Sequence, residues 1–506
     1  MTVRIDGGPL GIDDVLAVAD GADVVIDPAA HARMEPARRL VAEVVEQGRT
    51  VYGVTTGFGA LAGTRIDPEV AAEAQVALLR SHAAGVGEPL PDPLVRTMLA
   101  LRARTLAQGH SGVRPEVVEA LVAMLRAGIL PIVPAQGSVG ASGDLAPFAH
   151  LSLPLIGEGE VRYRGERMPS VDALAAAGLE PLTLRPKEGL SLLNGTEGML
   201  AMGVLGLRRA RRIAAAADIA CALSVEALLG SERPFQPAVH AVRPHPGQAR
   251  SATSIRSMLA GSEIVASHHD DFVHAVQDAY SLRCAPQVHG AVLDVLDHAV
   301  GVFERELASV VDNPIVFADR GVVVSGGNFH GQPLAFALDF MAIAVTELGS
   351  ISERRTDRIL DPERSSGLPP FLATHPGLNS GYMLTQYTAA ALVAENRVLS
   401  HPASVESIPT SGSQEDHVSM GWGAGRKLDG VLTNTARVVA VEILCAVEGV
   451  GHRAPLRPGT GSRAAVDAVR SVVPPLERDR SPAPAIEAIA ELIVDGSLEA
   501  AVDDAR

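Results

Sequence analysis

Residues 197–230 read EGMLAMGVLGLRRARRIAAAADIACALSVEALLG, and this stretch indicates what kind of fold the chain adopts. It contains no proline and few glycines, and much of it is apolar on every face. A helix of that composition has to be buried on most of its sides. The sequence therefore predicts a long helix in the interior of a helical bundle.

Further helical patterns follow this stretch along the chain, at residues 290–311, 331–360, 384–400 and 425–449. A helix of thirty residues spans about 45 Å, so several of them side by side form an elongated bundle. We expect an all-α fold with a mixed, mainly helical N-terminal domain (residues 1–190). A central bundle of long helices with a C-terminal helical segment (residues 191–506) follows. The all-round apolar helices also indicate that other subunits cover the bundle.

The composition and the charge of the chain argue against several classes of function. Of the 506 residues, 47% are hydrophobic and only 3% aromatic, a mix that favours closely packed helices. The formal net charge of −16 argues against a nucleic-acid partner or an anionic membrane surface. Cys221, Cys284 and Cys445 are far apart, so neither a disulfide framework nor a zinc site is indicated. Without an apolar leader or an apolar run of about 18 residues, the sequence predicts a soluble cytoplasmic protein.

The segments between the helical patterns concentrate polar, aromatic and charged side chains. Loops on a rigid scaffold commonly carry the chemistry of a protein. Six such segments are RSHAAGVG (80–87), SLLNGTEG (191–198), VQDAYSLRCAPQ (276–287), VDNPIVF (311–317), SGGNFHGQP (325–333) and SGSQEDHVSMGWG (411–423).

Residues 137–150, GSVGASGDLAPFAH, place three glycines around Ala141 and Ser142. The segment lacks the lysine of a P-loop, the spacing of a Rossmann turn and the G-x-S-x-G of a nucleophile elbow. One interpretation is a helix N-terminus capped by Asp144. The other is a self-made electrophile: the Gly143 nitrogen attacks the Ala141 carbonyl carbon, and loss of two waters leaves an exocyclic methylidene at residue 142.

This segment resembles the signature of the aromatic amino acid ammonia-lyases, whose electrophile is 4-methylidene-imidazol-5-one (MIO). The resemblance extends from VYGVTTGFGALAGTRI to QEDHVSMGWGAGRKL, and VQDAYSLRCAPQ, NFHGQP and QEDHVSM occur in the family's order. It implies that MIO forms from Ala141, Ser142 and Gly143 in the N-terminal domain, with no external cofactor. It also implies a homotetramer whose active sites draw residues from more than one subunit.

The resemblance implies a carbon–nitrogen lyase that converts the small molecule L-histidine to trans-urocanate and ammonia, the first step of histidine degradation. A phenylalanine or tyrosine ammonia-lyase, or an aminomutase of the same family, is the first alternative. An enzyme of the fumarase and argininosuccinate lyase type would carry a GSSxMPxKxN loop, which the sequence lacks. A non-enzymatic helical scaffold would need neither the Ala-Ser-Gly loop nor the polar segments.

Two of the five tyrosines, Tyr52 and Tyr280, lie in the densest motifs and match family positions that line the site. An isolated tyrosine more often anchors a core. A tyrosine base needs surroundings that favour the phenolate, because the free side chain has a pKa near 10. We expect Tyr280 to remove the β-proton and Tyr52 to act at the leaving ammonia.

The remaining substrate-binding residues also follow from the resemblance. Arg283, one helical turn after Tyr280, is expected to bind the substrate carboxylate. His82 and Glu415 are expected to hydrogen-bond the imidazole nitrogens. The alternative interpretation of Glu415 is a cap for a helix that begins near Asp416. The other three residues expected near the electrophile and the substrate are Asn194, Gln277 and Phe329.

No metal is expected. His268, His269, Asp270 and Asp271 are the most metal-like cluster, but adjacent residues in one short stretch seldom converge on one ion. Some positions depart from the commonest family pattern: Thr55 where many relatives carry Asn, Glu197 where Gln is frequent, and SGSQEDH in place of SANQEDH. These departures bear on fine specificity, since none is a residue assigned to bond making.

Overall fold

The protein is described from a computed structural model, and the structure describes residues 1–67, 69–140, 143–268 and 277–505. Spatial contacts divide the chain into two compact units. Unit 1 comprises residues 1–205, 301–338 and 402–426, and unit 2 comprises residues 206–300, 339–401 and 427–506. Because both units are discontinuous in sequence, the division of the chain after residue 190 stays a prediction.

Unit 1 is built around one buried helix, α4. Almost every residue of α4 from Leu94 to Ala107 is buried, and α4 packs against α1, α2 and α5. The helices of this region are α1 (Ile12–Ala19), α2 (Pro28–Glu46), α3 (Ala71–His82), α4 (Asp92–Ala107), α5 (Pro115–Ala127), α6 (Leu145–Ser152), α7 (Ser170–Ala177) and α8 (Glu188–Leu193).

Short strands accompany these helices, so the mixed character predicted for the N-terminal region is confirmed. Strands β1 and β2 pair in parallel, while β3 with β5, β4 with β6, β6 with β7, and β8 with β9 pair antiparallel. Their bounds are β1 (Thr2–Ile5), β2 (Asp23–Ile26), β3 (Val86–Pro89), β4 (Leu130–Pro131), β5 (Pro134–Gln136), β6 (Glu160–Tyr163), β7 (Glu166–Pro169), β8 (Ile315–Phe317) and β9 (Val322–Val324).

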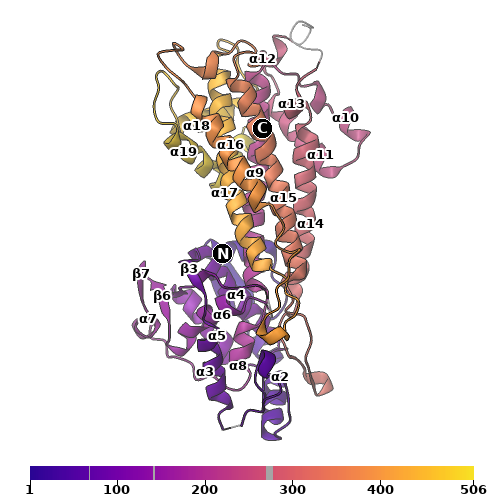
Figure 1. The fold of residues 1–506 in the computed structure, drawn as a ribbon, viewed down its shortest axis with the longest axis vertical. Helices are drawn as coiled ribbons and strands as arrows, with labels where there is room; N and C mark the ends of the chain where they lie inside the picture. Colours follow the sequence, from indigo (N-terminus) through magenta and orange to yellow (C-terminus); the bar gives the residue numbers. More distant parts are fainter. Residues whose placement is uncertain (68, 141–142, 269–276, 506) are drawn as a thin grey trace. The chain divides into compact units, whose positions relative to one another are not determined.

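The long helices lie mainly in unit 2, where Figure 1 draws them side by side. They are α9 (Glu197–Ala227), α14 (Ala285–Ala308), α15 (Gln332–Leu360), α16 (Met383–Leu399) and α17 (Gly421–Gly451). The first residues of α9, α15 and α17 and the last residues of α14 belong to unit 1. Shorter helices complete the chain: α10 (Pro237–Ala241), α11 (Pro246–Met258), α12 (Glu263–Ala266), α13 (Tyr280–Arg283), α18 (Thr460–Val472), α19 (Ala483–Asp495) and α20 (Ser497–Asp503).

Buried polar contacts join the long helices of unit 2. His289 of α14 lies 2.7 Å from the Asp218 carboxylate of α9, and Arg355 of α15 pairs with Glu442 of α17 at 2.5 Å. All four side chains are at most 6% exposed. Charges this deeply buried need partners with good geometry, so these contacts fix how the helices align.

The predicted all-α fold with a bundle of long helices is confirmed, including the helices expected at residues 197–230, 290–311, 331–360, 384–400 and 425–449. Helix α14 begins at Ala285 rather than at residue 290, and α17 begins at Gly421 rather than at residue 425, so that GWGAG belongs to α17. A Cβ on Gly421 would lie 2.4 Å from Met199 Sδ, and one on Gly425 would lie 2.5 Å from Met202 Sδ. These glycines therefore serve close helix packing rather than a turn.

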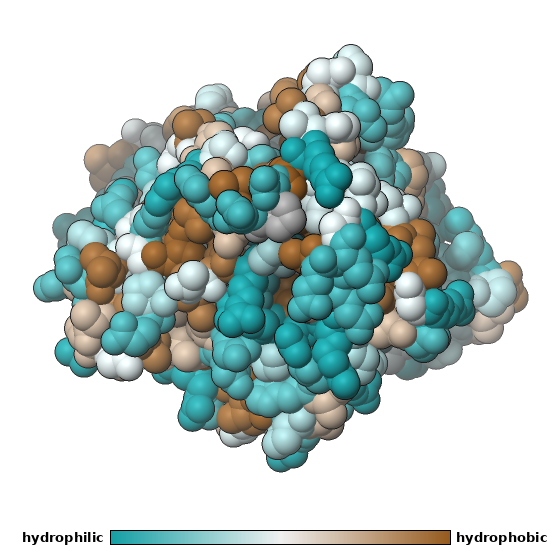
Figure 2. Space-filling view, turned by 90° about the horizontal axis from the view of Figure 1, so that it is seen from below, coloured by the Kyte–Doolittle hydropathy of each residue, from teal (hydrophilic) through white to brown (hydrophobic). Residues whose placement is uncertain are grey.

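Two described helices, α15 and α17, are long and apolar enough to cross a membrane by composition alone. Their most apolar windows are 67% and 83% buried within the protein, which is typical of core helices in a bundle. On the face drawn in Figure 2, hydrophilic residues predominate and hydrophobic residues occur in separate patches.

Candidate active site

The segment that follows Ala141 and Ser142 is held against the turn between α8 and α9. Gly143 pairs with Gly195 in a parallel bridge, and the Asp144 amide donates to the Gly195 carbonyl at 2.8 Å. Gly143 has φ +83°, and a Cβ there would lie 2.0 Å from the Gly195 carbonyl oxygen. Only glycine fits this position. Ala141 and Ser142 themselves lie outside the described residues.

Asp144 directly precedes helix α6. It occupies the N-cap position of α6, as the local pattern indicates, but its side chain makes no capping bond there. Its Oδ2 instead accepts the Met199 amide at 2.9 Å, in the first turn of α9. Burial raises the pKa of the Asp144 carboxyl well above its usual range, although the Met199 and Gly198 amides act in the opposite direction. The side chain thus ties the ring-forming segment to the long central helix.

The QEDHVSM motif and the residues that follow it contact the segment before residue 141. The Met420 amide donates to the Val139 carbonyl at 2.9 Å, and Trp422 Nε1 donates to the Ala135 carbonyl at 2.8 Å. Gly140 has φ +75°, and a Cβ there would lie 2.3 Å from Ser419 Oγ. Residues 419–422 therefore contact the stretch that ends at Gly140, although the two segments are far apart in sequence.

Tyr52 lies in a loop that its neighbours hold rigidly. Its hydroxyl accepts the Gly59 amide at 3.2 Å. Thr55 Oγ1 accepts the Val51 amide at 2.9 Å and donates to the Arg49 carbonyl at 2.6 Å. Thr55, which stands where many relatives carry Asn, therefore shapes the Tyr52 loop.

Glu415 closes a turn next to the Tyr52 loop. Thr410 Oγ1 donates to Glu415 Oε2 at 2.8 Å, and the two residues also pair through their backbones. The loops meet where the Ala60 amide donates to Ser411 Oγ at 3.1 Å. Since the next helix begins at Gly421, Glu415 does not cap a helix near Asp416.

His82, the last residue of α3, interacts electrostatically with the Glu415 carboxylate. Burial lowers the pKa of His82, while the Glu415 carboxylate acts to raise it. The loop that follows His82 is anchored by His150 of α6, whose Nε2 accepts the Gly85 amide at 3.0 Å. An imidazole nitrogen that accepts a bond carries no proton, so His150 is neutral here. Burial lowers the pKa of His150, in agreement with that state.

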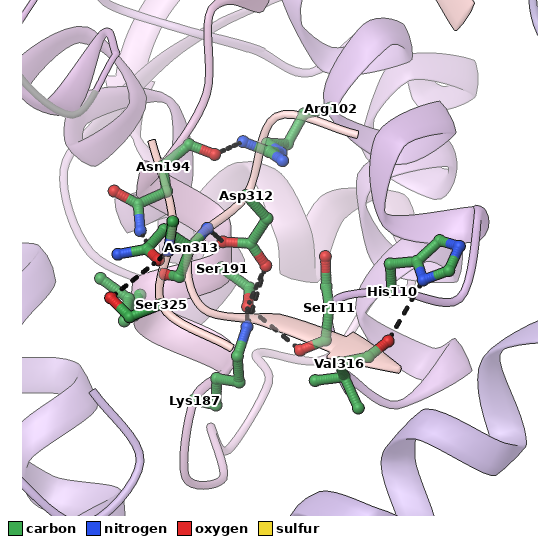
Figure 3. Close-up of polar contacts among 12 residues, drawn as sticks. Arg102, His110, Ser111, Lys187, Ser191, Asn194, Asp312, Asn313, Val316 and Ser325 are labelled. Atoms are coloured by element: carbon green, nitrogen blue, oxygen red, sulfur yellow. Dashed lines mark hydrogen bonds and ion pairs between the residues drawn. The ribbon is translucent and has the colours of Figure 1, made fainter. Parts of the chain in front are cut away.

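Asn194 and Phe329 lie on two further segments of unit 1. Asn194 is 3% exposed, ends α8 and donates from Nδ2 to the Asn313 carbonyl at 2.7 Å (Figure 3). Phe329 is half-buried in a turn closed by a 2.9 Å bond from the His330 amide to the Gly327 carbonyl. The His330 and His417 rings, 5.6 Å apart, bring the NFHGQP and QEDHVSM motifs together.

Gln277, Tyr280 and Arg283 belong to unit 2. Tyr280 and Arg283 share the single turn of α13, as their spacing predicts, and the guanidinium lies 4.4 Å from the centre of the tyrosine ring. Arg283 Nε donates to the Asp278 carbonyl at 2.9 Å. Tyr280 is 71% exposed, and Gln277 is also exposed. Within unit 2, the structure therefore brings Tyr280 and Arg283 together on α13.

Sequence reasoning missed several buried charges near Asn194. Arg102 of α4 bonds the Asn194 carbonyl and pairs with Glu197 at 3.2 Å, with both side chains at most 3% exposed. Lys187 and Asp312 form a second, fully buried ion pair. The available signal was a charged residue inside an apolar run, as in LALRARTLA and RPKEGLSLLNG. Such a residue needs a buried partner.

Of the metal-like cluster, His268 lies among the described residues. His268 Nε2 lies 3.0 Å from the Gly230 carbonyl, whereas His269, Asp270 and Asp271 lie outside the described residues. Among the side chains that the structure describes, no group of three or more His, Cys, Asp or Glu is placed to hold a metal ion. The absence of a metal stays a prediction.

Comparison with known proteins assigns the class. The family model for aromatic amino acid lyases matches residues 10–471. The chain belongs to the aromatic amino acid lyase family.

Individual relatives narrow this further. The chain is 53% identical to the histidine ammonia-lyase of Gloeobacter violaceus over 502 residues, covering 99% of this chain and 97% of that protein. It is 52% identical to the histidine ammonia-lyase of Deinococcus radiodurans, with 96% and 92% covered.

Solved structures share the fold over the whole chain. The crystal structure of histidine ammonia-lyase from Trypanosoma cruzi has a TM-score of 0.91 and 44% identity, covering 100% of this chain and 95% of that one. A tyrosine aminomutase from Streptomyces globisporus has a TM-score of 0.95 and 40% identity, with 100% and 99% covered. The fold is common to both activities, so the backbone alone does not select the substrate.

Proposed function

We propose that the chain is a histidine ammonia-lyase, a carbon–nitrogen lyase that converts L-histidine to trans-urocanate and ammonia without oxidation. This reaction is the first step of histidine degradation. The observation that carries the proposal is the identity of about half of all residues, over nearly the whole chain, with histidine ammonia-lyases from different bacteria. The electrostatic interaction between His82 and Glu415 supports it, because both groups suit an imidazole.

We infer that the electrophile is MIO, formed from Ala141, Ser142 and Gly143 without an external cofactor. The surroundings fit that closure, since Gly143 occupies a space that no side chain can enter. When formed, the group supplies an electron sink for loss of the amine, a poor leaving group. Neighbouring residues hold the segment in place through the Asp144 and Met420 contacts.

The residues of the chain divide the remaining work. Elimination requires loss of the β-proton and departure of the amine with its electron pair, and the amine gains a proton to leave as ammonia. We assign proton removal to the Tyr280 oxygen and protonation of the leaving amine to Tyr52. Arg283 binds the carboxylate through its guanidinium, while His82 and Glu415 bind the imidazole. Asn194, Gln277 and Phe329 complete the pocket around the substrate.

We infer a homotetramer in which each active site takes residues from more than one subunit. Tyr280, the assigned base, is 71% exposed in a single chain, whereas a phenolate base needs a site that excludes water. Apolar side chains of α15 and α16 are also exposed, including Phe340 (47%), Ile343 (43%), Leu384 (54%) and Tyr387 (61%). Exposed apolar residues of this kind are typical of subunit interfaces.

We further propose a cytoplasmic enzyme that binds neither nucleic acid nor membranes. The net charge of −16 supports this, because phosphate backbones and anionic lipid surfaces attract basic proteins.

An aromatic amino acid lyase or aminomutase of the same family is the second candidate, and the 40% identity with the tyrosine aminomutase favours it. Purified protein should be incubated separately with histidine, phenylalanine and tyrosine, with the conjugated acid product followed by ultraviolet absorbance. We expect turnover of histidine with a preference of at least about a hundredfold, because a site built to bond ring nitrogens rejects rings that lack them. A preference for phenylalanine or tyrosine, or release of a β-amino acid, would select the alternative.

A further inference from the structure

Lys187 is fully buried at the start of α8, in a region that the proposed reaction does not explain. It is the N-cap residue of α8 with φ +73°, and its side chain is 0% exposed. Its ammonium donates to Asp312 Oδ2 at 2.9 Å and to Ser191 Oγ at 2.9 Å (Figure 3). A lysine is almost never buried without such a partner.

Asp312 connects Lys187 to the backbone of Asn313. Its Oδ2 also accepts the Ser191 hydroxyl at 3.0 Å, and its Oδ1 accepts the Asn313 amide at 2.7 Å. Both carboxylate oxygens are therefore engaged. Burial alone would raise the pKa of Asp312, but the charges of Lys187 and Arg102 lower it overall, so the carboxylate is ionised.

Asn313 is fixed from several directions. Its Oδ1 accepts the Gly326 amide at 2.8 Å and the Ser325 hydroxyl at 3.2 Å. Its backbone carbonyl accepts Asn194 Nδ2 at 2.7 Å. A carbonyl can only accept, so the amide nitrogen of Asn194 faces Asn313 and its Oδ1 faces the other way.

Asn194 is held equally firmly along its backbone. Its amide donates to the Leu190 carbonyl at 3.1 Å, and its carbonyl accepts from Arg102. The next residue, Gly195, pairs with Gly143 and accepts the Asp144 amide. The backbone of Asn194 is therefore fixed directly before a residue that contacts Gly143 and Asp144, and the Asn313 carbonyl fixes its carboxamide.

We propose that Lys187 and Asp312 are positioning residues that hold the Asn313 carbonyl and thereby orient the Asn194 carboxamide, with its oxygen toward a donor of the bound amino acid. This inference rests on the proposed function. An ion pair buried this deeply is a costly way to stabilise a fold, because apolar residues of similar volume often do as well. A role in orienting the Asn194 carboxamide explains why this buried pair is charged.

A double-mutant cycle tests the proposal. Lys187→Met should lower kcat/KM for histidine about 10- to 100-fold, because a small misplacement of a binding group costs that much. In an Asn194→Ala background, Lys187→Met should change kcat/KM less than about threefold, because the group it orients is gone. Intact mass should still show the loss of two waters, about 36 Da, that ring formation requires.

Two further variants keep the test decisive. Lys187→Met with Asp312→Asn leaves no unpaired buried charge and replaces the single variant if that one fails to fold. Arg114→Gln with Glu188→Gln is the control: it removes the 2.7 Å ion pair at the start of the same helix α8, leaves no buried charge unpaired and touches no contact of Asn194. We expect its kcat/KM to stay within about twofold of the parent, as for a change away from the site.

Three results would overturn the proposal. The first is unchanged kcat/KM in the Lys187 variants, and the second is that Lys187→Met lowers kcat/KM as much in the Asn194→Ala background as in the parent. The third is loss of the mass deficit in the Lys187 variants. If the parent protein itself lacks the deficit and does not convert histidine, the proposed function fails instead.

Discussion

Glu415→Gln is the substitution that most sharply separates substrate recognition from folding. The turn that holds Glu415 should survive, because the Thr410 hydroxyl can donate to the glutamine oxygen as it does to Oε2, at 2.8 Å. The backbone pair between the two residues, at 2.9 and 3.3 Å, does not involve the side chain. What changes is the negative charge offered to the imidazole N–H and to His82.

The expected loss follows from the value of one charged hydrogen bond. Such a bond contributes about 1.5–3 kcal/mol, which corresponds to a decrease of about 10- to 150-fold in kcat/KM for histidine. The pKa of His82 should also fall further, because burial already lowers it and the variant removes the Glu415 charge, which opposes this effect together with a backbone hydrogen bond at Leu78.

The assay is steady-state turnover of histidine by product absorbance, with intact mass measured on the same samples. Glu406→Gln is the matched control, since Glu406 is an exposed carboxylate on the same segment of the chain. We expect the control to retain normal kcat/KM and both variants to retain the mass deficit. Parent-like turnover by Glu415→Gln would refute the role of this carboxylate in binding the imidazole.

Four further outcomes are expected. Gly143→Ala should lose both the mass deficit and activity, because the added Cβ would lie 2.0 Å from the Gly195 carbonyl oxygen; an active variant with an intact deficit would contradict this. Tyr280→Phe should keep the deficit but lose about 10²–10⁴-fold in kcat, the usual contribution of a general base; near-normal kcat would reassign the base. Co-expression of Ser142→Ala with Tyr280→Phe should restore activity that neither variant has alone, if subunits share sites; no recovery would place each site within one chain. Stability should fall as pH drops below about 6.5, because burial lowers the pKa of His150 and only its neutral form accepts the Gly85 amide; a melting temperature of His150→Gln with the same dependence between pH 7.5 and 5.5 as the parent would argue against that bond.

The sequence predicted the long helices well, because their apolar patterns extend over many turns and leave little choice of conformation. Helix ends were less predictable where packing overrides local preference. Gly421 and Gly425 have low helix propensity, yet they belong to α17 because Met199 and Met202 occupy the space beside them. A single sequence does not reveal such contacts between distant segments.

The residues of the candidate site were also predictable only in part. Motifs and their resemblance to a family indicated Tyr52, His82, Asn194 and Glu415, which the fold places on neighbouring loops and helix ends of unit 1. The same reasoning did not indicate Lys187 or Asp312, which are 125 residues apart and meet only in the folded chain. Their pairing depends on where α8 and the segment before β8 lie, and no local pattern encodes that.

Intact mass of the active parent protein tests the central claim most directly. We predict a mass lower than that of the encoded chain by two waters, about 36 Da by stoichiometry, in protein that converts histidine. Peptide mapping should assign the deficit to residues 141–143. A full-mass chain that still releases ammonia from histidine would contradict the proposed electrophile and the mechanism built on it.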